Sequence, residues 1–325
     1  MIIVQTPFRM SFLGGGTDIP QYYEKYGGSV LSTTFNKYCY HTIKWFPPFF
    51  PYKNKLTYSK IEEFNLPEEV CHPAVREALK LLKMQNLHIT YDADLPAKSG
   101  LGTSSSFAVG LLNGLHSLKG EFVDKMTLAK EAIHLERELC QEAGGIQDQL
   151  AVSFGGLNKY TFNNTGIDVK PLIISKERKQ NLSNNLMLFF TGFTRFSSEI
   201  ITEQIKNTEK KLQELHEMVS LVNEGEKILT GNGNLNDFGY LLDYTWKLKC
   251  SLSNNISSDG IDAIYQRAKK AGAIGGKLLG AGGGGFMLLF VEIDKQEQVK
   301  QKLSEFLYIP FEFETSGTKV IYYKP

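Results

Sequence analysis

The chain has 325 residues, of which 42% are hydrophobic and 22% are charged, which is typical of a globular protein and long enough for two domains. With 36 Lys and Arg residues against 35 Asp and Glu, the net charge of +1 gives no electrostatic case for nucleic acid or an anionic membrane as the main partner. The sequence also lacks an apolar run of the roughly 20 residues that a membrane span needs, a signal-peptide pattern and any CxxC pair among its four cysteines, so we expect a cytoplasmic protein without disulfides or zinc.

The first half of the chain is predicted to mix strands and helices. The aromatic, proline-broken stretch 47–64 is expected to form a loop or hairpin. Residues 143–162 are expected to return to strand. Alternating and apolar runs predict strands at 2–8, 29–35, 38–46 and 87–96, and helical periodicity predicts helices at 72–86, from the glycine loop to 118, and at 124–142.

The second half restarts with a strand of buried type within 181–190 and a long charged helix at 197–229. Further helices are predicted at 235–250 and 295–307, and a strand at 318–324. Between residues 260 and 292 the pattern predicts a helix, then a glycine-rich segment and then a strand. We place the domain boundary near residues 175–185, which divides the chain into domains of 1–180 and 181–325. The mixture of helices and strands in both halves predicts α+β sandwiches.

The stretch "PAKSGLGTSSSFAVGLL", which begins at Pro96, places glycines and small hydroxyl residues before an apolar run. It is neither of the two commonest phosphate-binding motifs. A P-loop needs Ser or Thr after its Gly-Lys pair. The Gly-Lys pair of this chain, at Gly276 and Lys277, is followed by a leucine instead. A dinucleotide fingerprint needs a third glycine where Ser105 stands.

The residue types in this stretch nevertheless suit an anion. Gly100 and Gly102 let the backbone approach a ligand and adopt positive φ. Ser104, Ser105 and Ser106 are natural N-cap residues, and the start of a helix offers free N–H groups and a positive dipole. A hydroxyl in the first turn can also bind Mg²⁺. The alternative interpretation is a capped helix after a tight turn.

Three other stretches flank this loop in a fixed order: "TPFRMSFLGGGTD", "GGIQDQ" and "KLLGAGGGGF". Together with the loop they resemble the GHMP small-molecule kinases, the family of galactokinase, homoserine kinase and mevalonate kinase. The family's motifs are matched by 7–9 with Gly14, by 96–106 and by 277–285, and the resemblance covers essentially the whole chain. It implies an N-terminal domain of the ribosomal-protein-type βαβ fold, a C-terminal ferredoxin-like α/β sandwich, and ATP in the cleft between them.

Within this family the chain resembles the sugar 1-kinases. Its Thr17-Asp18 pair matches the residues that galactokinases use against sugar hydroxyls, but Gly15 and Gly16 replace the preceding Glu-His, which argues against galactose. The GGGTD form, "TGFTRFSSEI" and the C-terminal glycine run resemble kinases of D-glycero-D-manno-heptose 7-phosphate, which phosphorylate the anomeric C1 hydroxyl. The expected product is the 1,7-bisphosphate, a precursor of GDP-heptose or related surface glycans.

Three alternatives remain at this point. Fucokinase-like or other sugar 1-kinases share much of the pattern. A homoserine or isoprenoid kinase would not need the GGGTD turn. A non-catalytic sugar or nucleotide sensor of the same fold would be expected to lose the carboxylate or the metal ligands, which this chain keeps.

The resemblance also implies roles for individual residues. Asp148 is the expected catalytic carboxylate, as base or as orienting group, and Arg9 the cation that stabilises charge on the transferred phosphoryl group. The alternative for Asp148 is a solvated or capping residue, and the alternative for Arg9 is a surface arginine at a strand end. Mg²⁺ is expected on Ser104 and Glu136. The expected ATP-binding residues are Gly100, Leu101, Gly102, Thr103, Ser104, Ser105 and Ser106.

The remaining expectations concern the acceptor. A sugar phosphate needs a cation for its distal phosphate, and Arg195, with Lys249 behind it, is the candidate. The expected partners are a small-molecule sugar phosphate, ATP and Mg²⁺, with no nucleic acid and no membrane, in a monomer or homodimer. The expected substrate-binding residues are Gly16, Thr17, Asp18, Arg195, Gly283 and Gly284.

Overall fold

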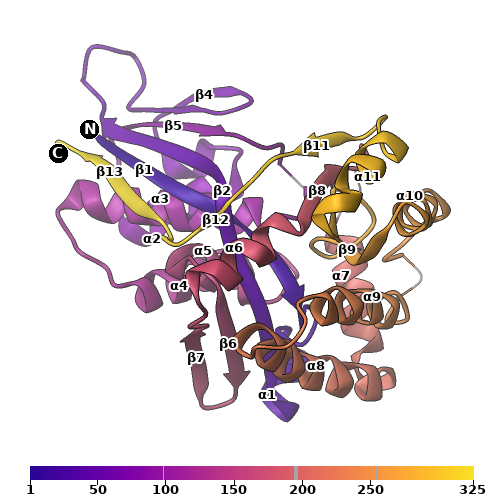
Figure 1. The fold of residues 1–325 in the computed structure, drawn as a ribbon. Coiled ribbons are helices and arrows are strands. Elements are labelled where there is room, and N and C mark those ends of the chain that lie inside the picture. Colours follow the sequence, from indigo (N-terminus) through magenta and orange to yellow (C-terminus); the bar gives the residue numbers. More distant parts are fainter. Residues whose placement is uncertain (98, 194–196, 254) are drawn as a thin grey trace.

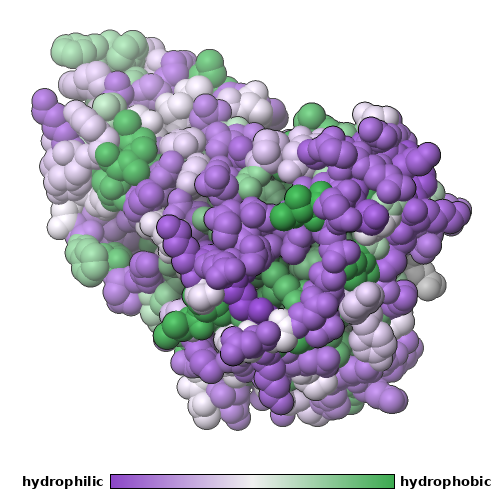
Figure 2. Space-filling view, in the orientation of Figure 1, coloured by the Kyte–Doolittle hydropathy of each residue, from purple (hydrophilic) through white to green (hydrophobic). Residues whose placement is uncertain are grey.

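The computed structural model describes residues 1–97, 99–193, 197–253 and 255–325. Its strands form two sheets, of nine and four strands, with helices packed against them (Figure 1), so the predicted α+β class is confirmed. In the described part of the chain, no helix combines the length and the apolar character needed to cross a membrane. The face seen in Figure 2 is mostly hydrophilic, with hydrophobic residues in small separate groups.

The first sheet has a path of six strands in the order β13-β1-β2-β5-β3-β4, with β6 and β12 also paired to β2, and β7 paired to β6. Its long central strand β2 was predicted as two separate strands. It runs unbroken because both parts have a role in the sheet. Its first eight residues are buried, and in the part that pairs with β5 buried and partly exposed side chains alternate. The strands are β1 Ile2–Leu13, β2 Gly28–Trp45, β3 Asn54–Thr57, β4 Ile61–Phe64, β5 Leu87–Ala93, β6 Asn158–Asn163, β7 Gly166–Pro171, β12 Phe313–Glu314 and β13 Lys319–Tyr323.

Helix α3 is the helix that positions the glycine loop. It lies tightly on β1 and β2, since a Cβ on Gly110 would come within 2.7 Å of Thr6 Oγ1 and one on Gly114 within 2.6 Å of Ile43 Cδ1. The helices of this half are α1 Pro20–Tyr26, η1 Pro67–Glu69, α2 Pro73–Leu82, α3 Thr103–Lys119, α4 Lys125–Ile133, the π-helical η2 His134–Leu139, α5 Gln147–Phe154 and α6 Lys176–Asn184.

The second sheet is antiparallel with the order β11-β8-β10-β9. Numbered along the chain this is fourth, first, third, second, the order of a ferredoxin-like sandwich. Its elements are β8 Leu186–Phe190, α7 Ser197–Asn207, η3 Thr208–Lys210, α8 Leu212–Thr230, α9 Asn236–Cys250, α10 Asp259–Lys270, β9 Ala273–Leu278, β10 Phe286–Val291, η4 Ile293–Lys295, α11 Gln296–Lys302 and β11 Leu307–Ile309.

Two further predicted elements differ from the structure. The long helix expected at 197–229 is divided into α7 and α8 by the 3-10 turn η3, where the buried Thr208 hydroxyl donates to the Gln204 carbonyl. The strand expected from residue 143 begins only at β6, because residues 147–154 form helix α5. An apolar run that is buried on most sides does not distinguish a short helix from a strand by its periodicity.

The last strands of the chain return to the first sheet. After β11, β12 pairs with β2 and β13 pairs with β1 along the edge of the sheet (Figure 1). One hydrophobic cluster also joins the halves, with Phe8 and Met10 of β1 beside Phe238 of α9 and Phe290 of β10. The boundary between residues 180 and 181 stays a prediction.

Candidate active site

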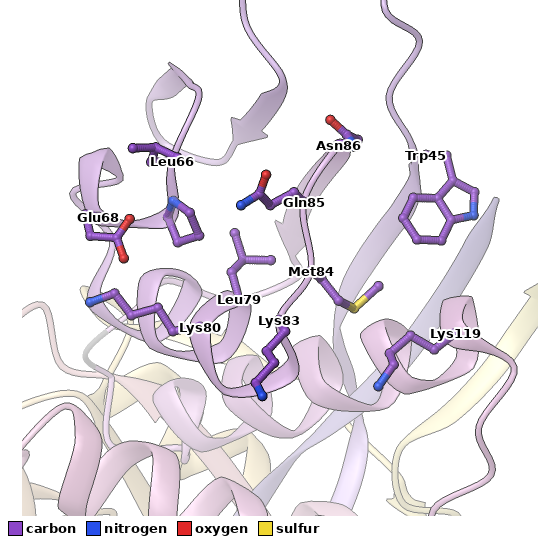
Figure 3. A pocket seen from close by; sticks show the side chains of 11 residues that line it. Trp45, Leu66, Glu68, Leu79, Lys80, Lys83, Met84, Gln85, Asn86 and Lys119 are labelled. Atoms are coloured by element: carbon purple, nitrogen blue, oxygen red, sulfur yellow. The ribbon is translucent and has the colours of Figure 1, made fainter.

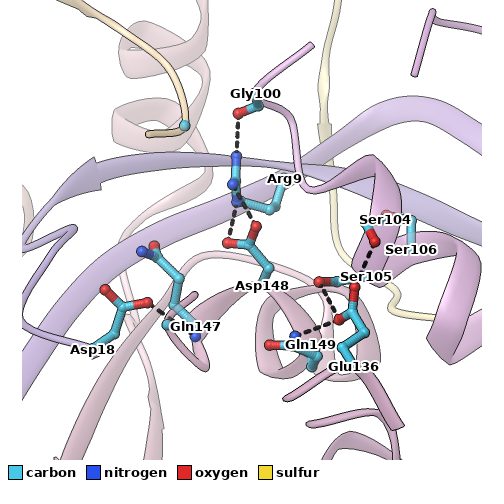
Figure 4. A network of polar contacts seen from close by, with 12 residues as sticks. Arg9, Asp18, Gly100, Ser104, Ser105, Ser106, Glu136, Gln147, Asp148 and Gln149 are labelled. Carbon is cyan, nitrogen blue, oxygen red and sulfur yellow. Dashed lines mark hydrogen bonds and ion pairs between the residues drawn. The ribbon is translucent and has the colours of Figure 1, made fainter. Parts of the chain in front are cut away.

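Arg9 and Asp148 form an ion pair at the centre of the site. Arg9 Nε and Nη2 each donate to one carboxylate oxygen of Asp148 at 2.6 Å, and Nη1 donates to the carbonyl of Gly100 at 2.6 Å (Figure 4). Arg9 comes from β1 and Asp148 from the first turn of α5. Because the arginine is only 4% exposed, its fork is fixed, and it ties the carboxylate to the glycine loop.

The glycine loop lies directly over this pair. Gly100 and Gly102 adopt φ of +78° and +73°, and a Cβ on Gly102 would stand 3.0 Å from Arg9 Cγ. Helix α3 starts at Thr103 and its N-cap residue is Gly102. None of the three serines is the N-cap residue, although their residue type favours that position. The first amides of a helix have no acceptor inside it, which leaves the N–H groups that an anion can use.

The serine side chains point instead toward a buried glutamate. Glu136, 1% exposed, accepts hydrogen bonds from Ser104 Oγ at 2.6 Å and Ser105 Oγ at 2.7 Å, and another from the side-chain amide of Gln149 (Figure 4). Glu136 lies in the π-helical η2, where the helix predicted at 124–142 widens. Such single wide turns often occur at functional sites. The Ser106 hydroxyl donates to the carbonyl of Pro7 and takes no part in this cluster.

This cluster fits a magnesium ion rather than a transition metal. Glu142 Oε2 lies 3.4 Å from Ser104 Oγ, so a hydroxyl and two carboxylates meet at the start of α3. Burial and the nearby Glu136 carboxylate raise the pKa of Glu142. In the part of the chain that the structure describes, no group of three or more His, Cys, Asp or Glu residues could hold a metal ion by itself. Oxygen ligands completed by waters and phosphate oxygens are the usual environment of Mg²⁺.

A cavity of about 90 Å³ opens beside Asp148 between the two halves. Asp18 lies in its wall, 3% exposed, and is held by the backbone N–H groups of Gly16 at 2.9 Å and Gln147 at 3.3 Å. The cavity is therefore polar and carries two carboxylates. Its lining residues are Arg9, Ser11, Gly15, Gly16, Asp18, Ile19, Arg137, Gly144, Gly145, Gln147, Asp148, Ile201, Gln204, Lys249, Gly280 and Ala281.

Two buried lysines, Lys249 and Lys277, lie near the wall of this cavity. Burial lowers the pKa of Lys249 to about 8, with the Asp18 carboxylate opposing the shift and the Arg9 guanidinium adding to it. Burial and the nearby cations Lys249 and Arg9 also hold the pKa of Lys277 well below its ordinary value. Lys277 donates to a backbone carbonyl of β1 and does not line the cavity, whereas Lys249 does. Lys249 is thus the lysine that a ligand in the cavity can reach.

The C-terminal glycine run closes against the glycine loop. A Cβ on Gly280 would stand 2.5 Å from Gly100 Cα, and one on Gly285 would stand 2.2 Å from the Ser99 carbonyl. The two glycine-rich segments therefore contact each other through their backbones. This contact requires glycine because backbone meets backbone.

The structure brings some of the predicted acceptor residues into the cavity and not others. Gly16 and Asp18 line it. The Thr17 hydroxyl, in the turn between β1 and α1, donates to the carbonyls of Gly14 and Ser29. From the C-terminal run, Gly280 and Ala281 line the cavity, whereas Gly283 bonds to Ile256 and Gly284 packs on Phe193. Arg195 lies outside the described residues. The substrate-binding roles of these residues stay predictions.

Several residues of the site were not predicted. Gln149 and Gln147 flank Asp148 in "GIQDQ", and a polar pair around a candidate catalytic carboxylate was a usable signal. Ser11 is the polar residue two positions after Arg9 in a strand, so it faces the same side, which was a second signal. Glu142 follows a helix end and had no signal of its own.

A larger hollow of about 790 Å³ lies elsewhere (Figure 3). It includes Trp45 at the end of β2, Met84 after α2 and Lys119 at the end of α3. Since α3 begins at the glycine loop and rises about 1.5 Å per residue, the two ends of the helix are about 24 Å apart. This hollow is separate from the Arg9–Asp148 site.

Comparisons with known proteins agree with this arrangement. A D-glycero-alpha-D-manno-heptose 7-phosphate kinase from Campylobacter jejuni is 32% identical, over 98% of each chain. A bifunctional fucokinase/GDP-fucose pyrophosphorylase from Arabidopsis thaliana is 26% identical over 93% of this chain and 31% of its own length. The crystal structure of a D-glycero-D-manno-heptose 1-phosphate kinase from Bacteroides thetaiotaomicron has the same fold, with a TM-score of 0.82 over 100% of both chains at 22% identity.

Residues 65–156 match the GHMP kinases N terminal domain, and residues 226–309 match the GHMP kinases C terminal domain. The first match contains the glycine loop, Glu136 and Asp148, and the second contains Lys249 and the C-terminal glycine run. The chain therefore belongs to the GHMP kinase family and is an ATP-dependent phosphotransferase with an alcohol group as acceptor.

Proposed function

We propose that this protein is a sugar 1-kinase that converts D-glycero-D-manno-heptose 7-phosphate to the 1,7-bisphosphate with ATP and Mg²⁺. The observation that carries the proposal is the end-to-end similarity to the heptose 7-phosphate kinase of Campylobacter jejuni. The polar cavity beside Asp148 is consistent with a hydroxylated acceptor.

The start of α3 would hold the triphosphate. Its backbone N–H groups, which follow a loop whose Gly100 and Gly102 have positive φ, would provide the cradle for the phosphates. Ser104 and Glu136 would hold Mg²⁺, with Glu142 in reach. When bound, the ion neutralises charge on the phosphate oxygens.

Asp148 would orient the attacking C1 hydroxyl or accept its proton. Both of its oxygens accept hydrogen bonds from Arg9, and each oxygen keeps a lone pair for the acceptor. Arg9 is positioned between this carboxylate and the glycine loop, where it would stabilise charge on the transferred phosphoryl group. Positioning and charge stabilisation supply most of the catalysis of phosphoryl transfer.

The distal phosphate of the acceptor needs cations. Lys249 and Arg137 both line the cavity and donate to backbone carbonyls, Lys249 to Gly280 and Arg137 to Gly145. We propose Lys249 as one of the groups that meet this phosphate, together with Arg195. The second candidate function is a fucokinase-like 1-kinase, which the similarity to the Arabidopsis thaliana fucokinase favours.

The test is a panel of acceptors with ATP and Mg²⁺. The panel contains D-glycero-D-manno-heptose 7-phosphate, D-mannose, D-mannose 6-phosphate, L-fucose, D-galactose and mevalonate, and ³¹P NMR identifies the product. A new anomeric phosphate on the heptose phosphate, with the highest kcat/KM of the panel, is the expected result. A higher kcat/KM for fucose would favour the second function, and preference for mevalonate would contradict both. Binding of sugars without turnover would identify a sensor.

The Asp148→Asn variant is the control for the catalytic assignment. The substitution keeps the shape of the side chain but removes its charge, so kcat should fall at least about 100-fold. Since Asp148 lies at the surface of the cavity and not in the core, circular dichroism should show an unchanged fold. A variant with the wild-type kcat would show that this carboxylate is not catalytic.

A further inference from the structure

Ser11 has a hydroxyl group that the fold does not use. Its side chain is 4% exposed and lines the cavity, and its Oγ has no hydrogen-bond partner among the described residues. Buried hydroxyls are nearly always hydrogen-bonded, because an unpaired one costs free energy. Ser11 faces the cavity because residues two positions apart in a strand lie on the same face, and Arg9, two positions earlier in β1, also lines this cavity.

A second unpaired group faces the same space. Gln147 Oε1 is buried without a partner in the part of the chain that the structure describes. Gln147 comes directly before Asp148 at the start of α5, and both residues line the cavity (Figure 4). Two residues from different elements, each with an unpaired oxygen atom, therefore line the same cavity.

Gly15 leaves the room between these groups open. A Cβ built on Gly15 would stand 3.6 Å from Ser11 Oγ, 3.5 Å from Gln147 Nε2 and 4.0 Å from Lys249 Nζ. These are ordinary van der Waals distances, so the space at Gly15 is about the size of one small group. Its polar neighbours can each bond to an atom that enters it.

The chemistry of these groups selects a hydroxyl. Of the groups nearest to Gly15, Gln147 Nε2 donates hydrogen bonds, whereas Ser11 Oγ both accepts and donates. A sugar hydroxyl can accept from Gln147 Nε2 and at the same time donate to Ser11 Oγ, whereas an ionised phosphate oxygen can only accept.

We infer that Ser11 and Gln147 form a subsite, at Gly15, for a ring hydroxyl of the acceptor. This inference rests on the proposed function for the identity of the acceptor. The subsite holds the sugar on the side of Asp148 that faces Asp18 and thereby selects among acceptors, while Asp148 acts on the hydroxyl that receives the phosphoryl group.

The first test removes the unpaired hydroxyl. Ser11→Ala should weaken the binding of D-glycero-D-manno-heptose 7-phosphate about 3- to 10-fold in calorimetric titration without ATP, the worth of one hydrogen bond. Its thermal stability should not fall, because the lost group has no partner in the protein. Ser153→Ala is the matched control, since Ser153 Oγ is equally buried and unpaired but does not line the cavity. It should bind the sugar like the wild type.

The second test fills the space. Gly15→Ala should fold normally, because its Cβ meets no atom closer than 3.5 Å and the residue has no positive φ. It should nevertheless weaken sugar binding by more than Ser11→Ala and leave the KM for ATP unchanged. Gly233→Ala adds the same methyl group where no atom lies within 4 Å and should change neither.

The outcomes separate this inference from the proposed function. Weaker sugar binding by Ser11→Ala and Gly15→Ala, with both controls unchanged, supports the subsite even if the panel shows no turnover. Wild-type affinity of both variants, or loss of stability in Ser11→Ala, overturns it. If neither the heptose phosphate nor L-fucose binds the wild type in the titration, no sugar subsite exists here and the inference fails.

Discussion

Lys249 is the residue whose charge links stability and binding in this site. Its side chain is 4% exposed, and burial lowers its pKa to about 8 from an ordinary 10.5. Between these two values the unfolded chain binds more protons than the folded one, so stability rises as pH increases through this window. Below about pH 8 the full penalty of burying the ammonium is present. A cation that destabilises the fold is retained at a cavity wall, which is typical of a functional group.

Replacing this lysine should therefore stabilise the protein at neutral pH. At pH 7 the unfolding free energy of Lys249→Met should exceed that of the wild type, because the wild type buries a charged ammonium. This difference should shrink by about 3 kcal/mol between pH 7 and pH 10.5, where Lys249 loses its charge in the folded wild type. Urea denaturation at several pH values measures this difference. The acceptor KM of Lys249→Met should be raised at pH 7, while Lys249→Arg should retain more of the affinity. A difference in stability that does not vary with pH would contradict the assignment.

At the scale of elements, the family resemblance named residues that the structure brings into contact, but the local pattern did not predict all the elements that carry them. Arg9 pairs with Asp148 and Ser104 with Glu136, near the starts of α3 and α5, while the functional roles of these residues stay predictions. Helix α5 was read as strand, because eight residues of mostly buried side chains show no period. The π turn around Glu136 could not be predicted, since its geometry depends on contacts with Ser104, Ser105 and Gln149.

The glycine loop allows a prediction about an element junction. Gly100 and Gly120, before and after α3, both have φ of +78°, so an alanine at either position carries the same backbone strain of about 1–2 kcal/mol. A Cβ on Gly100 would also stand 2.4 Å from the Leu279 carbonyl, while one on Gly120 meets nothing within 4 Å. Gly100→Ala should therefore lose more stability than Gly120→Ala.

Only the Gly100→Ala variant should also raise the KM for ATP, because the loop must move away from the C-terminal glycine run. Gly120→Ala should keep the wild-type kinetics. Thermal denaturation and initial rates at varied ATP measure both effects. Equal losses of stability in the two variants would show that the contact with Leu279 has no influence.

For the whole molecule, the pairing of distant segments is what the sequence did not predict. The strand at 318–324 was expected, but nothing in its residues indicated that β13 would pair with β1 rather than extend the second sheet. A sheet partner is chosen by long-range packing, which a local pattern does not contain. The result is a molecule in which the final strands, the shared hydrophobic cluster and the two glycine segments all join the halves.

These connections predict that the two halves unfold together. The C-terminal segment before β13 lies directly against helix α5 at Gly317, where a Cβ would stand 2.0 Å from the Ser153 carbonyl. The next residue, Thr318, donates its N–H to the Val152 carbonyl at 2.8 Å. Gly317→Ala must push this segment off α5 and should destabilise the protein by about 1–3 kcal/mol. Scanning calorimetry should show one transition, at a lower Tm than in the wild type, whereas Gly233→Ala should leave the Tm unchanged. Two separate transitions, or an unchanged Tm for Gly317→Ala, would show that the C-terminal strands are only loosely attached to the first sheet.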